Sequence, residues 1–355
     1  MALGSIDMNT IKSTIALLLL LLINQAFAIN VGFNQAWFKT HYSGQYLDQY
    51  YDVVEVERIL KLTQDAKSHT LRLWFFESSN FPMINFENGK MVSLKSDYIR
   101  NVITTIRLAQ KYDIKIYMTI FDAHNYRPDK LSKEELQKFR SLFQKTGLNE
   151  FLNKIISPLL QAIQNENLAG TIGKIDLINE GDTVINRGGF DNNWSGMGQM
   201  LCQWKSFLQY FPQFEKTPIT MSIRLHPLLH LPSDLLEDNG PMKCADFIDL
   251  HSYDDGGDIY RCSYLQKYSR LNKKKLVLGE FGQNYFNGRY SDELQSKNMK
   301  NYIENANRCG FSEALAWRLS DVRSGVNKEA RYSFEAFGQM RPAYYLIQKN
   351  NSSNP

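Results

Sequence analysis

The chain has 355 residues, of which 43% are hydrophobic and 22% are charged. This composition is typical of a globular protein, and the length is sufficient for one large α/β domain. Because 41 basic residues face 37 acidic ones and no dense run of Lys or Arg occurs, nothing in the sequence indicates a nucleic-acid partner.

Residues 1–28 predict an N-terminal extension followed by a signal peptide. Lys12 precedes the apolar run Ile15–Ile23, and Ala26-Phe27-Ala28 follows it. A basic residue, a short apolar run and a small-x-small site describe a signal peptide cleaved after Ala28. The run is short for a membrane span, so an uncleaved anchor is the less favoured alternative. The sequence therefore predicts a secreted or periplasmic protein that is not membrane-bound after cleavage.

Four cysteines make disulfides possible in an exported protein. Their spacing does not suggest a zinc site, and four cysteines allow three complete pairings. The nearest pair, Cys244 with Cys262, is the first expectation. Four free, buried thiols are the alternative. The cysteines are Cys202, Cys244, Cys262 and Cys309.

Short apolar runs rich in β-formers alternate with longer helical stretches from Ile29 onward, which is typical of successive βα units. One helix is predicted over Ser96–Lys111, where apolar residues recur at helical spacing. A helix or helix pair, broken near Gly147, is predicted within Lys133–Asn165, and another helix from about Met197 to Phe211. The eight predicted strands are Ile29–Asn34, Thr70–Phe76, Ile114–Phe121, Lys174–Asn179, Pro218–Ile223, Phe247–His251, Lys275–Glu280 and Glu313–Arg318.

Eight strands, each with room for a helix after it, predict an α/β fold with a single (β/α)8 TIM barrel over residues 29–350. A doubly wound open sheet is the alternative, but no Gly-rich phosphate loop follows the first strand. In a barrel of this kind the chemistry lies at the C-terminal ends of the strands. The residues at those ends are therefore the candidate site residues.

Two of the apolar strands end on a glutamate, Glu180 on strand four and Glu280 on strand seven. A single such carboxylate could be an exposed strand end, but two carboxylates on facing strands indicate a functional site. Two facing carboxyl groups suit glycosidic cleavage, for which a retaining enzyme holds them about 5–5.5 Å apart. A cation and a phenol, Arg72 and Tyr253, would keep one glutamate ionised, while the other, more desolvated, would hold its proton.

These strand-end residues together resemble clan A of the glycoside hydrolases, and most of all glycoside hydrolase family 5, which includes cellulases and mannanases. The resemblance covers essentially the whole mature chain as scattered motifs, and it implies that Glu180 is the acid/base and Glu280 the nucleophile. It also implies supporting roles for further residues. By this resemblance, Arg72 orients the nucleophile and Asn179 binds the sugar 2-hydroxyl. His124 closes strand three in Asp122-Ala123-His124, His251 lies near the acid/base and Tyr253 near the nucleophile. Trp317 forms a floor on which the sugar stacks.

One position departs from the family pattern. The family often has Pro after the acid/base glutamate, where this chain has Gly181. The glycine predicts a looser loop at this point.

Weaker signals have both a functional and a structural interpretation. Trp37 and Trp194 are either sugar platforms or packing residues, and Asn34 either bonds substrate or caps a turn. The loops 181–196 and 283–292 either shape a substrate groove or only decorate the surface. Asn193 and Asn351 begin glycosylation sequons, which matter only in a eukaryotic secretory host.

The sequence as a whole favours a secreted, monomeric, retaining β-glycoside hydrolase that is endo-acting on a β-1,4-linked polysaccharide or oligosaccharide, a glucan or a mannan. Its expected partner is a carbohydrate substrate, and no cofactor or metal is expected. A metal-dependent amidohydrolase barrel is one alternative, although six His and no His-x-His pair on the first strand leave few ligands. A non-catalytic sugar-binding protein derived from a hydrolase is the other alternative.

Overall fold

The computed structural model of the protein describes residues 29–38, 44–77, 81–126, 132–133, 135, 140–142, 144–186, 194–224, 240–253, 257–259, 261–282, 291–320, 332–336 and 338–353. The predicted signal peptide, the sequon at Asn193 and most of the loop 283–292 lie outside these residues. Within the described ranges, no helix combines the length and apolar character that a membrane crossing requires.

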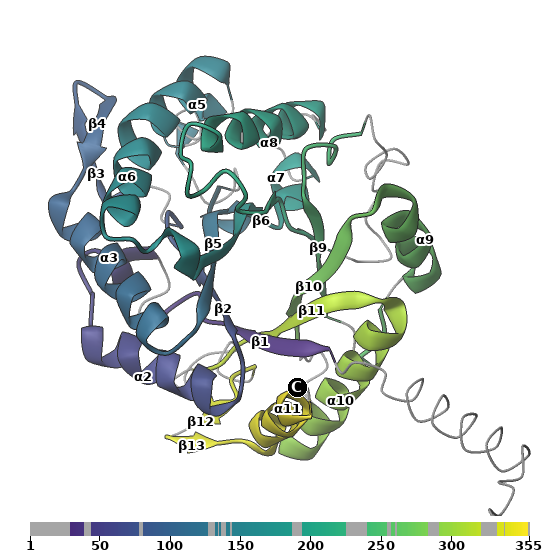
Figure 1. Cartoon of the computed structure of the whole chain (residues 1–355). Helices are drawn as coiled ribbons and strands as arrows, with labels where there is room; N and C mark the ends of the chain where they lie inside the picture. The colour runs from purple at the N-terminus through teal and green to yellow at the C-terminus, as the bar shows by residue number, and fades with distance from the viewer. Residues whose placement is uncertain are drawn as a thin grey trace, which may run out of the picture.

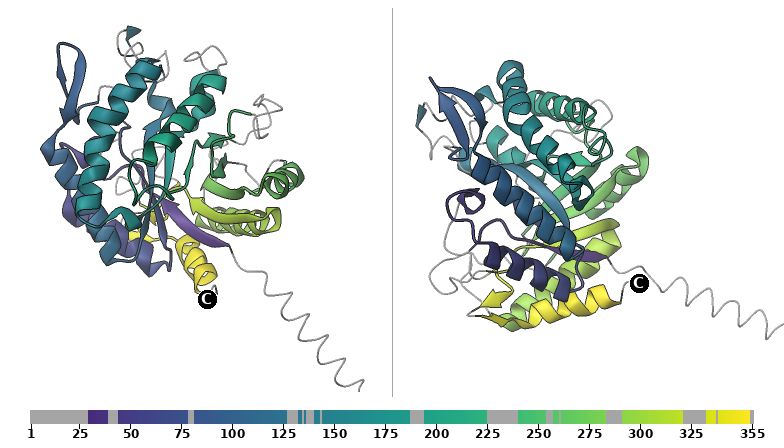
Figure 2. Two further views of the ribbon diagram at one scale, coloured as in Figure 1. Left: turned by 45° about the horizontal axis from the view of Figure 1, so that its top comes forward. Right: turned by 60° about the vertical axis from the view of Figure 1, so that its left-hand side comes forward.

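A curled parallel sheet forms the centre of the molecule, with helices around its outside (Figure 1 and Figure 2). The strand order is β7-β6-β5-β2-β1-β11-β10-β9-β8. The two strands at the ends of this order, β7 and β8, are separated in the chain only by Met221 and Ser222, so together they close the ring. The strands are β1 (Asn30–Asn34), β2 (Thr70–Trp74), β5 (Lys115–Asp122), β6 (Ile172–Asn179), β7 (Ile219–Thr220), β8 (Ile223–Arg224), β9 (Phe247–Ser252), β10 (Lys275–Phe281) and β11 (Phe311–Ala316).

Helices and short helical turns connect these strands and cover the outside of the sheet. Local signals in the sequence fix several of their ends. The Asp52 carboxylate accepts from the first-turn amides of α2, Ser291 caps α10, and Gly310 ends α10 in a left-handed conformation. The helices are α2 (Val53–Asp65), α3 (Ser96–Lys111), α5 (Lys145–Phe151), α6 (Ser157–Asn165), α7 (Gly181–Asn186), α8 (Trp194–Leu208), α9 (Cys262–Asn272), α10 (Asp292–Cys309) and α11 (Pro342–Ser352). The turns are η1 (Gly44–Leu47), η2 (Ala123–Tyr126), the π-helical η3 (Leu152–Ile156) and η4 (Ala169–Thr171).

Two antiparallel hairpins lie outside the barrel sheet. One joins β3 (Ile84–Glu87) to β4 (Lys90–Leu94), and the other joins β12 (Glu335–Ala336) to β13 (Gln339–Met340). Neither hairpin was among the predicted elements.

The predicted barrel is confirmed, with three corrections. The fifth predicted strand is split into β7 and β8, which pair with β6 and β9 respectively. The break predicted near Gly147 is not at this residue, which lies inside α5, whereas Leu142 and Gln144 before this helix are non-helical. The loop predicted to start at Gly181 begins instead with the short helix α7.

Asn351, the second sequon asparagine, is buried in α11. Its side-chain amide accepts from the Val31 amide at 3.0 Å and donates to the carbonyls of Val31 and Ala66 at 2.8 and 3.1 Å. These bonds tie the last helix to the first barrel strand. The folded chain therefore gives this asparagine a structural role and leaves it inaccessible to a glycosylating enzyme.

The cysteines form two disulfides, Cys202–Cys244 and Cys262–Cys309. The expected Cys244–Cys262 pair was wrong. Nearness in the sequence is a poor guide here because the barrel places α8 beside the segment that leads into β9, and the start of α9 beside the end of α10. Each disulfide joins two neighbouring segments on the outside of the sheet.

Removing one disulfide is expected to destabilise the protein without changing its fold. The disulfides close segments with sequence separations of 42 and 47 residues. Loops of this length correspond to a loss of about 4 kcal/mol in the free energy of unfolding for each disulfide removed. Urea denaturation of the Cys202→Ala/Cys244→Ala protein measures this loss. Peptide mapping without reduction checks the pairing, and a peptide linking Cys244 to Cys262 would contradict it.

Candidate active site

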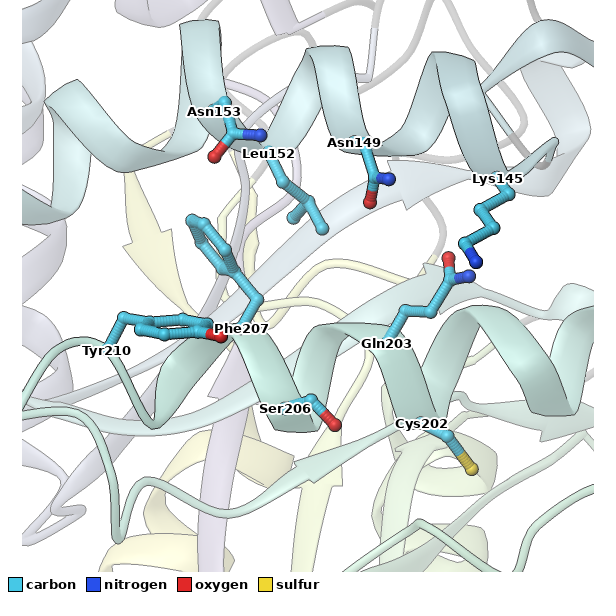
Figure 3. Close-up of a pocket in the computed structure, with 9 residues that line it drawn as sticks. All are labelled: Lys145, Asn149, Leu152, Asn153, Cys202, Gln203, Ser206, Phe207 and Tyr210. Carbon is cyan, nitrogen blue, oxygen red and sulfur yellow. The ribbon is translucent and has the colours of Figure 1, made fainter.

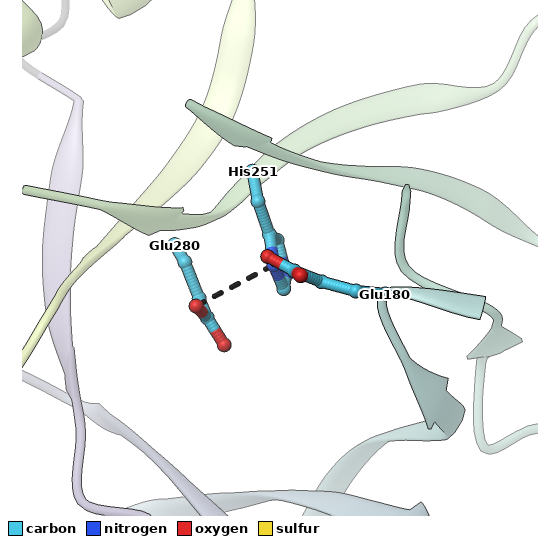
Figure 4. A group of neighbouring side chains, drawn as sticks. All are labelled: Glu180, His251 and Glu280. Carbon is cyan, nitrogen blue, oxygen red and sulfur yellow. Dashed lines mark hydrogen bonds and ion pairs between the residues drawn. The ribbon is translucent and has the colours of Figure 1, made fainter. Parts of the chain in front are cut away.

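Two glutamates and a histidine meet at the C-terminal ends of three barrel strands. Glu180 directly follows β6, His251 lies on β9 and Glu280 lies on β10. All three side chains point toward one another inside the barrel mouth (Figure 4). One carboxylate oxygen of each glutamate and one His251 ring nitrogen all lie within 4.8 Å of one another. The two glutamates predicted from their strand ends are thus brought face to face.

Glu280 is held at both carboxylate oxygens by donors. The Arg72 guanidinium donates to its Oε1 at 2.5 Å, and the Tyr253 hydroxyl donates to its Oε2 at 2.7 Å. His251 Nδ1 lies 3.5 Å from Oε2. The side chain of Glu280 is buried, so these donors replace water and fix the direction of the carboxylate.

Arg72 is completely buried at the centre of a polar network below the glutamates. Its second terminal nitrogen donates to Asp176 at 2.6 Å and to Asn179 at 2.9 Å. Asp249, which is also buried, accepts from the Tyr117 hydroxyl. The sequence predicted Arg72 and Asn179 for this region, but it did not single out Asp176 or Asp249. Both aspartates interrupt otherwise apolar strands, and that interruption is the signal that could have revealed them.

The buried Asp249 requires a glycine on the neighbouring strand. A Cβ atom at Gly279 would lie 1.9 Å from Asp249 Oδ1. No side chain larger than hydrogen fits there while Asp249 keeps its position. Gly279 therefore makes room for the polar network immediately before Glu280.

Glu180 is surrounded by groups that can carry positive charge. Its Oε2 lies 2.5 Å from His124 Nε2 and 3.4 Å from Arg224 Nε. Its Oε1 lies 3.2 Å from His251 Nδ1. The Glu180 backbone has a φ of +51°, a conformation that is strained for a residue with a side chain. Strain of this kind is common where a side chain must be aimed at a functional position.

The charges around Glu180 lower its pKa and raise that of His124. Burial alone would raise the pKa of Glu180, but His124 and then His251 outweigh it and hold this pKa well below the usual range. Burial would lower the pKa of His124, yet the contact with Glu180 raises it to about 9. At neutral pH the proton of this pair resides on His124. The sequence predicted that the acid/base glutamate itself would hold its proton, and it missed the direct contact with His124.

Glu280 has a pKa above its ordinary value. Burial raises this pKa, and the opposing effects of His251, Arg72 and the Tyr253 hydroxyl only reduce the shift, while the charge of Glu180 adds to it. The two glutamates are thus electrostatically linked, as expected for carboxyl groups this close together.

Solved structures similar to this chain include β-mannanases and an exo-β-1,4-mannosidase. The β-mannanase of the blue mussel Mytilus edulis is 17% identical, with a TM-score of 0.61 over 91% of this chain and 92% of that one. The endo-1,4-β-D-mannanase of Thermotoga petrophila RKU-1 is 12% identical, with a TM-score of 0.63 over 91% of this chain and 99% of that one. The chain has their (β/α)8 barrel fold. An exo-β-1,4-mannosidase from Opitutaceae bacterium strain TAV5 is 12% identical, with a TM-score of 0.65 over 92% of this chain and 59% of that one.

No protein-family model and no curated protein matches the chain. At identities of 12–17% the structural matches establish the fold of the chain. They confirm, at the level of the fold, the resemblance to glycosidase barrels that the strand-end residues predicted.

Three tryptophans form an aromatic cluster, against which Tyr253, the partner of Glu280, packs. The Trp37 ring lies 5.4 Å from that of Trp74 and 5.5 Å from that of Trp317, both edge to face. The indole nitrogen of Trp37 donates to Glu77 at 2.6 Å. Trp37 is half-buried, whereas Trp317 is 5% exposed. Trp194, the other proposed platform, is buried at the start of α8, which favours the packing interpretation.

Two buried asparagines of the predicted site form hydrogen bonds with other residues of the barrel. The Asn34 amide donates to the carbonyls of Gly279 and Leu315 at 2.9 and 3.1 Å, and its oxygen accepts from Arg72. Asn179 donates to Asp122 at 2.9 Å. Asn34 therefore braces Arg72 against β10, which carries Glu280, and against the neighbouring β11.

Gly181 does not loosen the chain, contrary to the expectation from the missing proline. Its amide donates to the Ser222 carbonyl at 3.0 Å, a bond that proline cannot make. A Cβ at this position would lie 2.6 Å from the Met221 sulfur. The glycine thus fits a tightly packed start of α7.

Arg224 and Asp182 form a charged pair behind Glu180 that the sequence did not suggest. Arg224 donates to Asp182 Oδ2 from Nε and a terminal nitrogen at 2.9 and 2.8 Å, and its backbone amide donates to Oδ1 at 3.0 Å. Asp182 is completely buried, and burial raises its pKa to about 6 despite the opposing Arg224 charge. This pairing fixes the guanidinium against the acid/base candidate.

Glu180, His251 and Glu280 are also the group of described residues whose atoms could chelate a metal ion. The charges around them disfavour a dication. Arg72 and Tyr253 already occupy the Glu280 carboxylate, and His124 and Arg224 face that of Glu180. An added metal ion would have to approach these fixed cations at short range. The arrangement suits a pair of reacting carboxyl groups better than a metal centre.

Proposed function

We propose that the chain is a secreted retaining β-glycoside hydrolase, with Glu280 as the nucleophile and Glu180 as the acid/base. The observation that carries the proposal is the facing pair of buried glutamates, in which one carboxylate oxygen of each lies within 4.8 Å of one oxygen of the other. Inverting glycosidases need room for a water molecule and hold their carboxyl groups roughly 6.5–9.5 Å apart. The short separation therefore supports a mechanism in which one carboxylate attacks the sugar directly.

In the first step, an oxygen of Glu280 attacks the anomeric carbon, and the glycosidic C–O bond breaks as its oxygen takes a proton from Glu180. In the second step, Glu180 removes a proton from water, and the water oxygen displaces Glu280 from the anomeric carbon. Two displacements return the β-configuration. Arg72 and Tyr253 keep the attacking carboxylate aimed and stabilise its charge when it departs.

The proton for the first step is stored in the Glu180–His124 pair. Its transfer from His124 to Glu180 does not change the number of protons that the pair holds. The free-energy cost of this transfer is therefore independent of pH, and the rate follows the macroscopic pKa of the pair. Because the pKa of His124 is about 9, we expect kcat/KM to fall as the pH rises through roughly this value.

A β-1,4-mannan is the first substrate to test, because the similar solved structures named above are mannanases and a mannosidase. A reducing-sugar assay over mannans, glucans, xylans and galactans, with the purified mature protein, identifies the substrate. Proton NMR of the first product formed tests the mechanism, and an early α-anomer would overturn it. Tight oligosaccharide binding with no turnover on any substrate would instead support a sugar-binding protein, and activity lost on chelation would support a metal-dependent enzyme.

Replacing Arg224 with glutamine is expected to move the basic limb of the pH profile of kcat/KM upward by about 1 unit. Arg224 lies 3.4 Å from Glu180, and its charge also lowers the pKa of His124. Loss of this cation therefore raises the proton affinity of the pair whichever residue holds the proton. Arg100→Gln, at an exposed arginine of α3, is the control and leaves the limb in place. An unmoved limb in Arg224→Gln would show that Arg224 does not act on the proton of this pair.

A further inference from the structure

A groove lies between α5–η3 and α8, on the outside of the barrel (Figure 1 and Figure 3), and neither Glu180 nor Glu280 is among its lining residues. It has a volume of about 530 Å³, which is within the usual range for small-molecule sites. Side chains of both helical segments line it, with Tyr210 and Phe207 at one end and Lys145 and Gln203 at the other (Figure 3). From Lys145 to Asn153 the helical rise gives a length of about 12 Å, enough for a short stretch of a linear chain.

Four uncharged polar side chains line the groove and are available to a ligand. Asn149, Asn153 and Ser206 are exposed, and Gln203 is half-buried. In the described part of the chain, none of these four side chains has a hydrogen-bond partner. Each amide offers donors and an acceptor, and the serine hydroxyl offers both, so the set matches a ligand rich in hydroxyl groups. Lys145 is the one charged side chain among the lining residues.

An aromatic face stands beside these polar groups. Tyr210 is 82% exposed, and its backbone is fixed by a bond from its amide to the Phe207 carbonyl at 3.1 Å. Tyr and Phe rings offer flat apolar faces, and a hydroxyl-bearing ring can pack its C–H face on them while its edge bonds to amides. Leu152, which is buried, contributes apolar surface to the lining.

The groove is held in shape before any ligand arrives. Cys202, at the Gln203 end, is linked by its disulfide to Cys244, which fixes α8 to the segment before β9. On the inner side of α8, the Trp204 ring lies 6.5 Å from those of Phe151 and Phe207. A pre-ordered site loses less entropy on binding than a mobile one.

We propose that this groove is a second saccharide-binding site, which holds a neutral polysaccharide chain on the outside of the barrel. The choice of a saccharide rests on the proposed function, while the chemistry of the groove itself specifies an uncharged, hydroxyl-rich ligand with an apolar ring face. The groove would keep the protein on a polymeric substrate, and it would contribute nothing to cleavage of a short oligosaccharide.

Affinity electrophoresis tests the groove directly. The Glu280→Gln protein, which cannot consume the polymer, is run in native gels containing mannan, glucan, xylan or galactan. We expect one of these polymers to retard it, and Tyr210→Ala in the same background to raise the apparent Kd by about 3- to 10-fold. Asn149→Ala/Asn153→Ala is expected to weaken retardation as well. Tyr345→Ala, at a tyrosine of α11 that is 55% exposed, is the matched control.

Kinetics separate this inference from the proposed function. With Glu280 intact, Tyr210→Ala should leave kcat/KM unchanged on a short oligosaccharide and lower the rate on dilute polymer. Unchanged retardation in Tyr210→Ala, or no retardation of the parent protein by any of the polymers, overturns the groove proposal, even if hydrolysis is intact. Absence of hydrolysis together with Tyr210-dependent retardation instead overturns the proposed function and leaves the groove as a sugar site.

Discussion

Replacing Glu280 with glutamine is expected to lower kcat/KM on the natural substrate by about 10⁴-fold or more. Glutamine keeps the volume of the side chain and its acceptor oxygen, so the bond from Arg72 or Tyr253 survives in part. It lacks the charge that attacks the anomeric carbon, and no covalent intermediate can form. Steady-state kinetics on the polymer identified by the substrate panel measure the loss, and circular dichroism verifies the fold.

Glu313→Gln is the matched control for this experiment. Glu313 is likewise a buried glutamate on a barrel strand and is paired with a cation, Lys174. Its replacement should change stability and leave kcat/KM close to that of the parent. A Glu280→Ala protein provides a second measurement, because azide can enter the space left by the carboxylate and attack the anomeric carbon once. The product is then an α-glycosyl azide, and a β-azide or an unimpaired hydrolysis rate would remove Glu280 from the role of nucleophile.

The strand ends were the part of the site that the sequence could predict. Apolar runs that close on Glu180 and Glu280 have a period and length that identify buried strands, and parallel strands bring their C-terminal ends to one face. The strand ends also placed Arg72 and Tyr253 near the glutamates, and the family resemblance implied that both serve Glu280. The positions of the two glutamates followed from the order of residues along single strands.

Contacts between distant segments could not be predicted in this way. Asp182 and Arg224 are 42 residues apart, and their pairing depends on the way α7 packs beside β8. The disulfide pairing depends similarly on which segments outside the sheet lie side by side. The protonation of His124 was missed because it follows from a contact of 2.5 Å with Glu180, and a sequence pattern does not resolve distances of that size. The order of the barrel strands could be predicted from the sequence, whereas the pKa shifts depend on distances between side chains that only the structure gives.

Replacing Glu180 with glutamine is expected to lower kcat/KM on the natural polymer by about 10²- to 10⁴-fold. The size of the effect should depend on the leaving group, which distinguishes acid catalysis from substrate binding. An aryl glycoside with an acidic phenol departs without a proton, so its first step should proceed at nearly the parent rate. The second step still lacks its base, and a burst of phenol followed by slow turnover is the expected time course.

The pH profile gives Glu180→Gln a second signature. Without the Glu180 charge, the imidazole of His124 loses the partner that raises its pKa, so the fall in rate near pH 9 should disappear from the profile of the variant. In His124→Gln the basic limb should remain but move to lower pH. Glu180 then holds the catalytic proton alone, without the imidazole that raises the proton affinity of the pair. A basic limb at the parent position in Glu180→Gln would assign it to a group outside the pair. If the polymer and the aryl glycoside lost rate equally in the first step, Glu180 would be a binding residue, and the proton would have to come from elsewhere in the barrel mouth.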